Sequence, residues 1–240
     1  MDQFSRSALL IGREGVEKLG RAKVALFGVG GVGGYVAEAL ARGGVGAIAL
    51  YDPDTVSLTN LNRQIVALHS TLNQPKAEVM ARRLRDINPA IRVTAYPLFY
   101  LPENADQVDL SSYDHIADAI DTVTAKLDLI QRAYRLGVPI ISAMGAGNRL
   151  DPSQLRVGDI FETEGCPLAR VMRRELRKRG VPRLKVVYST EPALPHHPDA
   201  PKPQDSGRRA TPGSIAFVPP AMGLMMASVI VRDLLEGGGN

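Results

Sequence analysis

The sequence predicts an α/β fold in which a doubly wound, mostly parallel sheet carries helices on both faces and continues into a C-terminal extension. Three observations predict it. Residues 24–27 form a short apolar run, a glycine-rich turn follows directly, and strand-like and helix-like patterns then alternate as far as residue 143. Strands that alternate with helices in this way form parallel sheets with right-handed crossovers, the Rossmann-like arrangement.

Each element in this alternation has its own pattern. The run at residues 24–27 is apolar throughout, as expected for a parallel strand buried on both faces. Val36, Ala37 and Leu40 recur at helical spacing, and Gly43 follows to end that helix. The same criteria predict strands at residues 47–51, 91–95, 115–120 and 139–143, and helices at residues 76–87 and 126–136.

The pattern changes after Gly147. A helix is expected within residues 167–179 and a strand at residues 185–189. Residues 191–213 contain six prolines, so we expect a mobile loop without regular structure there.

A charge-free run at residues 214–231 approaches the length of a membrane span. Pro219 and Pro220 divide it, and charged residues follow it at once. We therefore expect a short β-like segment at residues 214–218 and a buried helix at residues 221–231, and no membrane span.

Composition limits the function classes. Lys and Arg total 29 against 25 acidic residues, a net charge of +4 that permits a nucleic-acid or phosphate partner. The single cysteine excludes an internal disulfide and the paired Cys-x-x-Cys zinc sites, so any metal should be bound by oxygen. The first residues do not have the pattern of a signal peptide, and we expect a cytoplasmic protein.

The glycine-rich turn is the first candidate binding element. Gly28, Gly30 and Gly33, with Gly31 between them, lie between a predicted strand and a predicted helix, where backbone amides can meet a nucleotide phosphate. Asp52 ends the second strand, where a carboxylate can accept hydrogen bonds from ribose hydroxyls. The alternative is that the glycines serve only close packing of strand and helix.

A dense group of polar side chains follows Asp52. Asn60, Arg63 and Gln64 come within one short segment, and Lys76 opens the next helix. Donors of this kind stabilise a triphosphate and its leaving pyrophosphate, whereas a hydride-transfer enzyme has no evident use for them. The alternative for Lys76 is an ordinary solvated lysine.

Four segments carry a resemblance to a known family. GVGGVG at residues 28–33, DPDTVSLTNLNRQ at 52–64, QPKAE at 74–78 and DAIDT at 118–122 together resemble the ThiF/MoeB superfamily, the bacterial relatives of ubiquitin-activating enzymes. The resemblance covers roughly residues 4–150 and implies ATP with Mg²⁺ in place of NAD.

The resemblance also implies roles for single residues. Asp52 would bind the ribose, Asn60 and Arg63 the phosphates, and Lys76 the pyrophosphate side. Asp121 would be the magnesium ligand, since one carboxylate suffices when phosphate oxygens complete the shell; the alternative is a helix-capping aspartate. The implied cofactor-binding set comprises Gly28, Gly30, Gly31, Gly33, Asp52, Asn60, Arg63, Gln64 and Lys76.

The first residues extend this resemblance. QFSRSALLIG at residues 3–12 resembles the family segment whose arginine reaches into the ATP site of a neighbouring subunit, which implies a homodimer and a catalytic role for Arg6. The alternative is a plain surface arginine. We expect residues 1–240 to form one adenylation domain, with a nucleotide-binding part at about 20–150 and a substrate and crossover-loop part at about 151–240.

Two further segments resemble a subgroup of the family. Residues 158–180 and 185–191 are similar to the tRNA threonylcarbamoyladenosine dehydratase group. That resemblance implies adenylation of the threonyl carboxylate of a modified adenosine in tRNA, followed by ring closure and release of AMP. The main alternative is activation of the C-terminal glycine of a ubiquitin-like sulfur-carrier protein. An NAD-dependent oxidoreductase and a non-catalytic nucleotide sensor are weaker alternatives.

The helix expected at residues 167–179 sorts into two faces. Its apolar face comprises Leu168, Val171, Met172 and Leu176. A second face carries Arg170, Arg173, Arg174 and Arg177. Four arginines in one stripe favour contacts with RNA phosphates over a merely solvated face.

The single cysteine, Cys166, directly precedes this helix. A thiol at a helix N-terminus can be activated, but relatives that form thioesters carry their cysteine on the long crossover loop, and residues 191–213 contain none. We therefore expect Cys166 to be a small apolar residue at the helix start and not a nucleophile.

Overall fold

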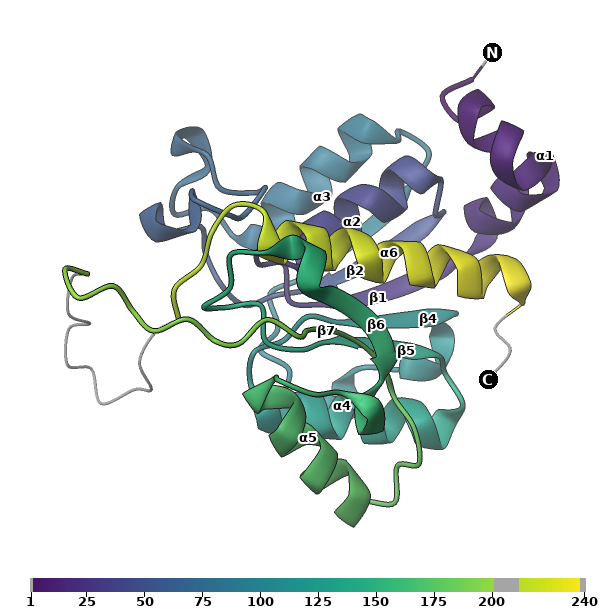
Figure 1. The fold of residues 1–240 in the computed structure, drawn as a ribbon. Coiled ribbons are helices and arrows are strands. Elements are labelled where there is room, and N and C mark those ends of the chain that lie inside the picture. Colours follow the sequence, from purple (N-terminus) through teal and green to yellow (C-terminus); the bar gives the residue numbers. More distant parts are fainter. Residues whose placement is uncertain (1, 201–211, 238–240) are drawn as a thin grey trace.

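A seven-stranded sheet forms the centre of the molecule in the computed structural model, which describes residues 2–200 and 212–237 (Figure 1). The strands are β1 (Lys23–Phe27), β2 (Ala47–Tyr51), β3 (Arg92–Tyr96), β4 (His115–Asp118), β5 (Ile140–Ala143), β6 (Leu155–Asp159) and β7 (Lys185–Ser189). Their order is β3-β2-β1-β4-β5-β7-β6, and all pairs are parallel except β6 with β7. The predicted fold class is confirmed, although the antiparallel edge strand β6 was not expected.

Strand β1 shows why its sequence is apolar at successive positions. Val24 and Leu26 pack into the core on one face of the sheet, and Ala25 and Phe27 pack into the core on the other. Successive side chains of a strand point to opposite faces, so a strand covered on both faces must be apolar throughout.

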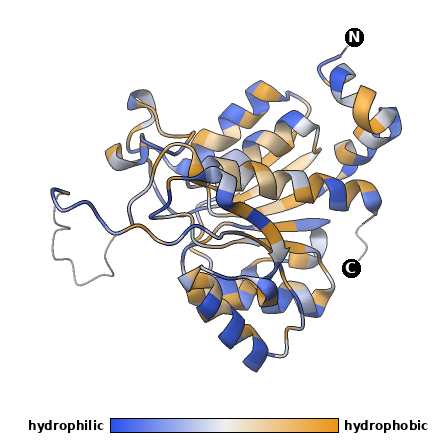
Figure 2. Cartoon of the chain, in the orientation of Figure 1, coloured by the Kyte–Doolittle hydropathy of each residue, from blue (hydrophilic) through white to orange (hydrophobic). Residues whose placement is uncertain are grey.

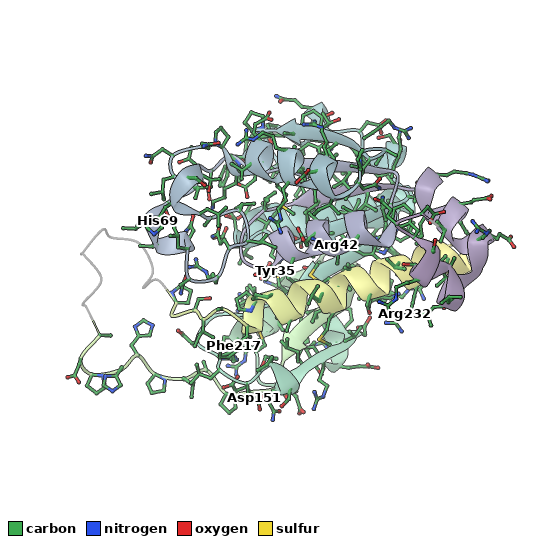
Figure 3. The ribbon with its side chains drawn as sticks, turned by 90° about the horizontal axis from the view of Figure 1, so that it is seen from above. Tyr35, Arg42, His69, Asp151, Phe217 and Arg232 are labelled. Atoms are coloured by element: carbon green, nitrogen blue, oxygen red, sulfur yellow. The ribbon has the colours of Figure 1, made fainter. Side chains whose placement is uncertain are left out.

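Helices cover both faces. They are α1 (Ser5–Arg21), α2 (Gly33–Gly43), α3 (Lys76–Ile87), α4 (Val123–Leu136), α5 (Pro167–Lys178) and α6 (Val218–Glu236). Figure 1 shows α2, α3 and α6 on one face and α4 and α5 on the other, with α1 at the periphery. Figure 3 looks down on α6, with Phe217 just before its start and Arg232 in its last part, beside α2 with Tyr35 and Arg42.

Helix α6 corrects one prediction. Residues 214–217 form no strand, and the helix begins at Val218, with Pro219 and Pro220 in its first turn. Proline is well suited to that position because the first turn of a helix has no internal partner for its N–H groups. The helix is long and apolar enough to cross a membrane by composition, but 56% of that window is buried in this fold, as expected for a core helix.

The remaining boundaries differ little from the predicted ones. Helix α4 begins at Val123, three residues before the predicted start, and β4 ends at Asp118, two residues before the predicted end. Residues 191–200, 212 and 213 contain no helix or strand, as predicted. The expectation for residues 201–211 falls outside the described part of the chain.

Candidate active site

The topological switch point of the sheet lies between β1 and β4. Strand β1 pairs with β2 on one side and with β4 on the other, so the chain leaves the carboxyl ends of β1 and β4 toward opposite faces. Ligands of open α/β sheets bind in the crevice at such a point. The glycine-rich turn follows β1 and Asp121 follows β4, so both predicted elements meet there.

Two glycines of the turn are required by space and backbone geometry. Gly28 has a φ of +88°, and a Cβ there would lie 2.7 Å from the carbonyl oxygen of Ala119. A Cβ on Gly33 would lie 1.8 Å from the carbonyl oxygen of Gly28. By contrast, the nearest atom to a Cβ on Gly30 would be Gln64 Nε2 at 3.8 Å. The turn is thus closely packed beneath, whereas a Cβ on Gly30 would make only an ordinary contact with Gln64, on the side where the start of α2 can meet a phosphate.

Asp52 connects the second strand to this turn. Its side chain is buried, Oδ2 accepts a hydrogen bond from the Val29 amide at 2.6 Å, and Oδ1 accepts one from the Asp54 amide at 2.8 Å. Burial raises the pKa of Asp52 above its usual value, while these two amides and the charge of Lys76 act in the opposite direction. Asp52 therefore fixes the glycine-rich turn, a role in addition to the predicted ribose contact.

Lys76 is a buried cation at the first position of α3. It is 6% exposed, and its Nζ lies 2.8 Å from Oδ2 of Asp54, whose side chain is 64% exposed. This geometry argues against a solvated surface lysine. A buried ammonium held by one solvent-facing carboxylate is well placed to receive a phosphate.

Arg63 and Gln64 lie beside the glycine-rich turn. The Arg63 guanidinium donates to the Thr59 carbonyl oxygen at 3.1 Å, and its Cγ would lie 3.4 Å from a Cβ on Gly31. Burial lowers the pKa of Arg63. Gln64 is buried, and its Oε1 has no hydrogen-bond partner among the described residues. Because buried polar atoms are normally paired, this oxygen is available to accept a hydrogen bond from a bound group.

Asn60 closes a short 3₁₀ helix, Leu58–Asn60. Its side chain is buried, and its Oδ1 accepts a hydrogen bond from the Ser57 amide at 3.1 Å. That bond fixes the orientation of the amide and uses only its oxygen. The nitrogen remains a suitable donor for a phosphate oxygen.

Asp121 is exposed on the turn between β4 and α4. Helix α4 has Thr122 at its N-cap without a side-chain capping bond, so the alternative of a capping aspartate is not realised. Within residues 2–200 and 212–237 no group of three or more His, Cys, Asp or Glu side chains is arranged to hold a metal. A single carboxylate can hold Mg²⁺ when phosphate oxygens complete the shell, so the exposed position of Asp121 is compatible with the ligand role that the resemblance implies.

A buried ion pair beneath this turn was not predicted. Lys126 and Asp118 are both fully buried, with Nζ 3.0 Å from Oδ2 of Asp118. Lys126 also donates to the Ile120 carbonyl oxygen at 3.0 Å, and Ser142 Oγ donates to Asp118 Oδ2 at 2.6 Å. These buried bonds stabilise the turn on which Asp121 lies. The sequence signal for this ion pair was a lysine among the apolar positions of α4.

Arg6 does not join the site within this chain. It is exposed on α1, near Phe4, which packs against Gly44 at the far end of α2 from the glycine-rich turn. Figure 1 shows α1 well separated from the carboxyl ends of the strands.

The arginine helix, α5, matches its predicted span with small differences. Arg170, Arg174 and Arg177 are exposed, whereas Arg173 is half-buried and its guanidinium donates to the carbonyl and hydroxyl oxygens of Thr163. On the apolar face the assignment of Val171 was wrong: this residue is 37% exposed, and Ala169 is buried instead. A helix buries only about three or four residues in every seven. Val171, the neighbour of the buried Met172, therefore faces outward.

Cys166 is 4% exposed and packs in the apolar core under α5. It is the N-cap residue of α5, and Pro167 is the first helical residue, as predicted. Its burial supports an apolar packing role.

A cleft of about 530 Å³ lies elsewhere in the molecule. It is lined at the amino ends of β5 and β7 and near the end of α6, with Lys185 and Asp233 among its residues. This is the opposite edge of the sheet from the glycine-rich turn. The predicted nucleotide residues do not line it.

Comparison with known proteins relates this geometry to characterised relatives. The sequence model of the ThiF family matches residues 4–238. The tRNA threonylcarbamoyladenosine dehydratase of Bacillus subtilis is 42% identical over 243 residues, covering 98% of this chain and 96% of that protein. The Escherichia coli tRNA N6-threonylcarbamoyladenosine dehydratase in complex with ATP has a TM-score of 0.85 at 35% identity, covering 98% of this chain and 94% of that one. A sulfur carrier protein adenylyltransferase of Thermus thermophilus is 36% identical over 143 residues, 59% of this chain.

Proposed function

This chain belongs to the ThiF family, and we infer that it is an ATP-dependent dehydratase acting on threonylcarbamoyladenosine in tRNA. One observation carries this function: similarity to a dehydratase extends over 98% of the chain, through the arginine helix and the residues after it, whereas similarity to the sulfur-carrier enzyme covers 59%. The nucleotide-binding part alone would fit either reaction. The extent of the similarity distinguishes them.

The reaction needs a carboxylate to become an electrophile. One oxygen of the threonyl carboxylate attacks the α-phosphorus of ATP, and the bond from that phosphorus to pyrophosphate breaks. The neighbouring carbamoyl group then attacks the activated carbonyl carbon, loses a proton and closes the ring while AMP leaves. The net change in the nucleoside is the loss of one water.

The site residues have definite roles in this reaction. Asp52 binds the ribose, and the amides of the glycine-rich turn with Asn60 receive phosphates. Arg63 and Lys76 stabilise charge on the leaving pyrophosphate, since fixed cations in a partly buried site act most strongly where charge develops. Mg²⁺ held by Asp121 would neutralise phosphate oxygens.

Activation of a sulfur-carrier protein is the second candidate, favoured by the 36% identity of the Thermus enzyme. Cys166 is buried, and the segment 191–213 contains no cysteine, so the chain offers no evident thiol for a relay. Exchange of labelled pyrophosphate into ATP tests the two functions, with modified tRNA and a sulfur-carrier protein as alternative acceptors. A tRNA substrate also makes the cytoplasm our proposed location.

We propose that the exposed arginines of α5 bind phosphates of the tRNA backbone. We expect Arg170→Ala/Arg174→Ala to weaken tRNA binding and to reduce the slope of log affinity against log salt by about one per lost phosphate contact. Arg173 is left intact because it is bound to Thr163. The measurement is tRNA affinity across a salt series, with Arg21→Ala/Arg92→Ala, on other exposed surfaces, as the control. An unchanged slope would show that these arginines do not contact RNA phosphates and form only a solvent-exposed face of the helix.

Two leucines of α1 support a homodimer. Leu9 is 85% exposed and Leu10 is 89% exposed, and Figure 2 shows hydrophobic residues on this peripheral helix. Adjacent exposed leucines of this kind mark an association surface, and Arg6 on the same helix would then approach a neighbouring site. We expect Leu9→Ser/Leu10→Ser to sediment as a monomer with reduced activity, and Leu136→Ser on α4 to remain dimeric. A native enzyme that sediments as a monomer at micromolar concentration contradicts this proposal.

A further inference from the structure

Arg149 is a buried cation outside the set of phosphate-binding residues. It lies in the loop after β5 and is 3% exposed. Across the described residues its guanidinium makes one hydrogen bond, from Nη1 to the Asn148 carbonyl oxygen at 3.1 Å, while its buried Nε has no partner. Glu191, close in the same region, accepts bonds from the Leu150 and Asp151 amides and forms no ion pair with Arg149.

Such an arrangement lowers the stability of a folded protein. A buried charge destabilises the fold unless an opposite charge and hydrogen bonds compensate it. Buried donors are almost always paired. A guanidinium that is buried with most of its donors unused is therefore suited to an anion that arrives from outside.

The position of Arg149 connects the crossover segment to the nucleotide site. Its neighbour Asn148 accepts a hydrogen bond from Leu194 at 2.9 Å and donates one to the Gly213 carbonyl oxygen at 2.7 Å, so both ends of the segment meet here. From Gly213 the chain runs past Ser214, whose carbonyl oxygen accepts a bond from Asn62 at 3.0 Å.

The same stretch then reaches the glycine-rich turn. Pro219, at the start of α6, lies against Gly31, where a Cβ would be 3.2 Å from the proline ring. Asn62 is the direct neighbour of Arg63. The loop of Arg149 and the phosphate-binding residues are therefore joined by one short segment, residues 213–219, at the same edge of the sheet.

We propose that Arg149 binds the carboxylate of the substrate before that carboxylate is activated, an assignment that rests on the proposed function. The attacking group is an anion that must approach the negatively charged phosphates of ATP. A guanidinium holds a carboxylate through paired hydrogen bonds and offsets this repulsion. Once the acyl-adenylate forms, the carboxylate charge is gone, so Arg149 acts mainly on substrate binding and selects substrates that carry a free carboxylate.

Stability of the free protein separates this role from a structural one. Arg149→Met removes an uncompensated buried charge, so its Tm without ligands should equal or exceed that of the native enzyme. Arg83→Met is the matched control, because Arg83 forms two hydrogen bonds with the buried Glu38 and its loss should lower the Tm. A lower Tm for Arg149→Met, with unchanged substrate affinity, would make Arg149 a structural residue and overturn the proposal.

Substrate recognition is measured with two anticodon stem-loop RNAs, one carrying threonylcarbamoyladenosine and one carrying unmodified adenosine at the same position. Arg149→Met should raise KM for the modified RNA by about ten- to hundredfold with little change in kcat. It should also lose the preference for the modified RNA, measured as the ratio of the Kd values for the two RNAs. Equal weakening for both RNAs would assign Arg149 to a backbone phosphate and overturn the proposal. If the native enzyme itself shows no preference, the proposed function fails, which is a different result.

Discussion

Replacement of Lys76 by methionine is expected to lower the rate of ATP-dependent adenylation by about 10²–10³-fold, the usual cost of losing one group that stabilises developing charge. The ammonium is buried at the start of α3 and is paired with Asp54, whose carboxylate faces solvent. Methionine keeps the length of the side chain and its apolar stem. Formation of AMP in a single turnover measures the change, and circular dichroism checks that the fold is retained.

Lys185→Met is the matched control for this variant. Lys185 lies 2.7 Å from Asp233, much as Lys76 lies 2.8 Å from Asp54, but at the opposite edge of the sheet. The control should turn over at close to the native rate. Equal losses in the two variants would show that Lys76 contributes to stability and not to the reaction.

Loss of Lys126 should produce the largest change in stability. Lys126→Met leaves the Asp118 carboxylate fully buried without its cation, which typically costs about 3–5 kcal/mol in the free energy of unfolding. It also leaves the Ile120 carbonyl oxygen without its lysine donor, and so loosens the turn that presents Asp121. Urea denaturation, followed by both fluorescence and circular dichroism, measures the loss.

A double variant separates the charge from the position of the turn. Asp118→Asn/Lys126→Met removes the uncompensated carboxylate and should recover much of the lost stability, because an amide costs less to bury than a charge. If Lys126→Met alone proved as stable as the native chain, the buried ion pair would have no role in the fold.

The strands and helices of the first half were predictable because their apolar periodicity reflects burial in a sheet covered on both faces. Strand β6 was not, since residues 155–159 alternate weakly and one of its apolar residues, Val157, is 40% exposed at the sheet edge. The start of α6 was misplaced because proline was treated as a break. In the first turn of a helix proline is compatible with helical structure.

Within the candidate site, sequence reasoning found the groups that follow strands and turns, such as Asp52 and Lys76. It did not find residues whose role depends on long-range packing. Lys126 occupies a helix where a lysine normally faces solvent, and its partner Asp118 lies on a different element. Arg149 is buried where Leu194 and Gly213, from a distant part of the chain, form hydrogen bonds with its neighbour Asn148, and the local sequence does not reveal that burial.

We propose that ATP activates a carboxylate on modified tRNA, and not the C-terminus of a carrier protein, at the glycine-rich turn. Exchange of labelled pyrophosphate into ATP measures this most directly. We expect exchange that depends on tRNA containing threonylcarbamoyladenosine. It should be absent with unmodified tRNA, with a ubiquitin-like sulfur-carrier protein and with the Lys76→Met enzyme. Exchange driven by the carrier protein, with none driven by the modified tRNA, would contradict this proposal.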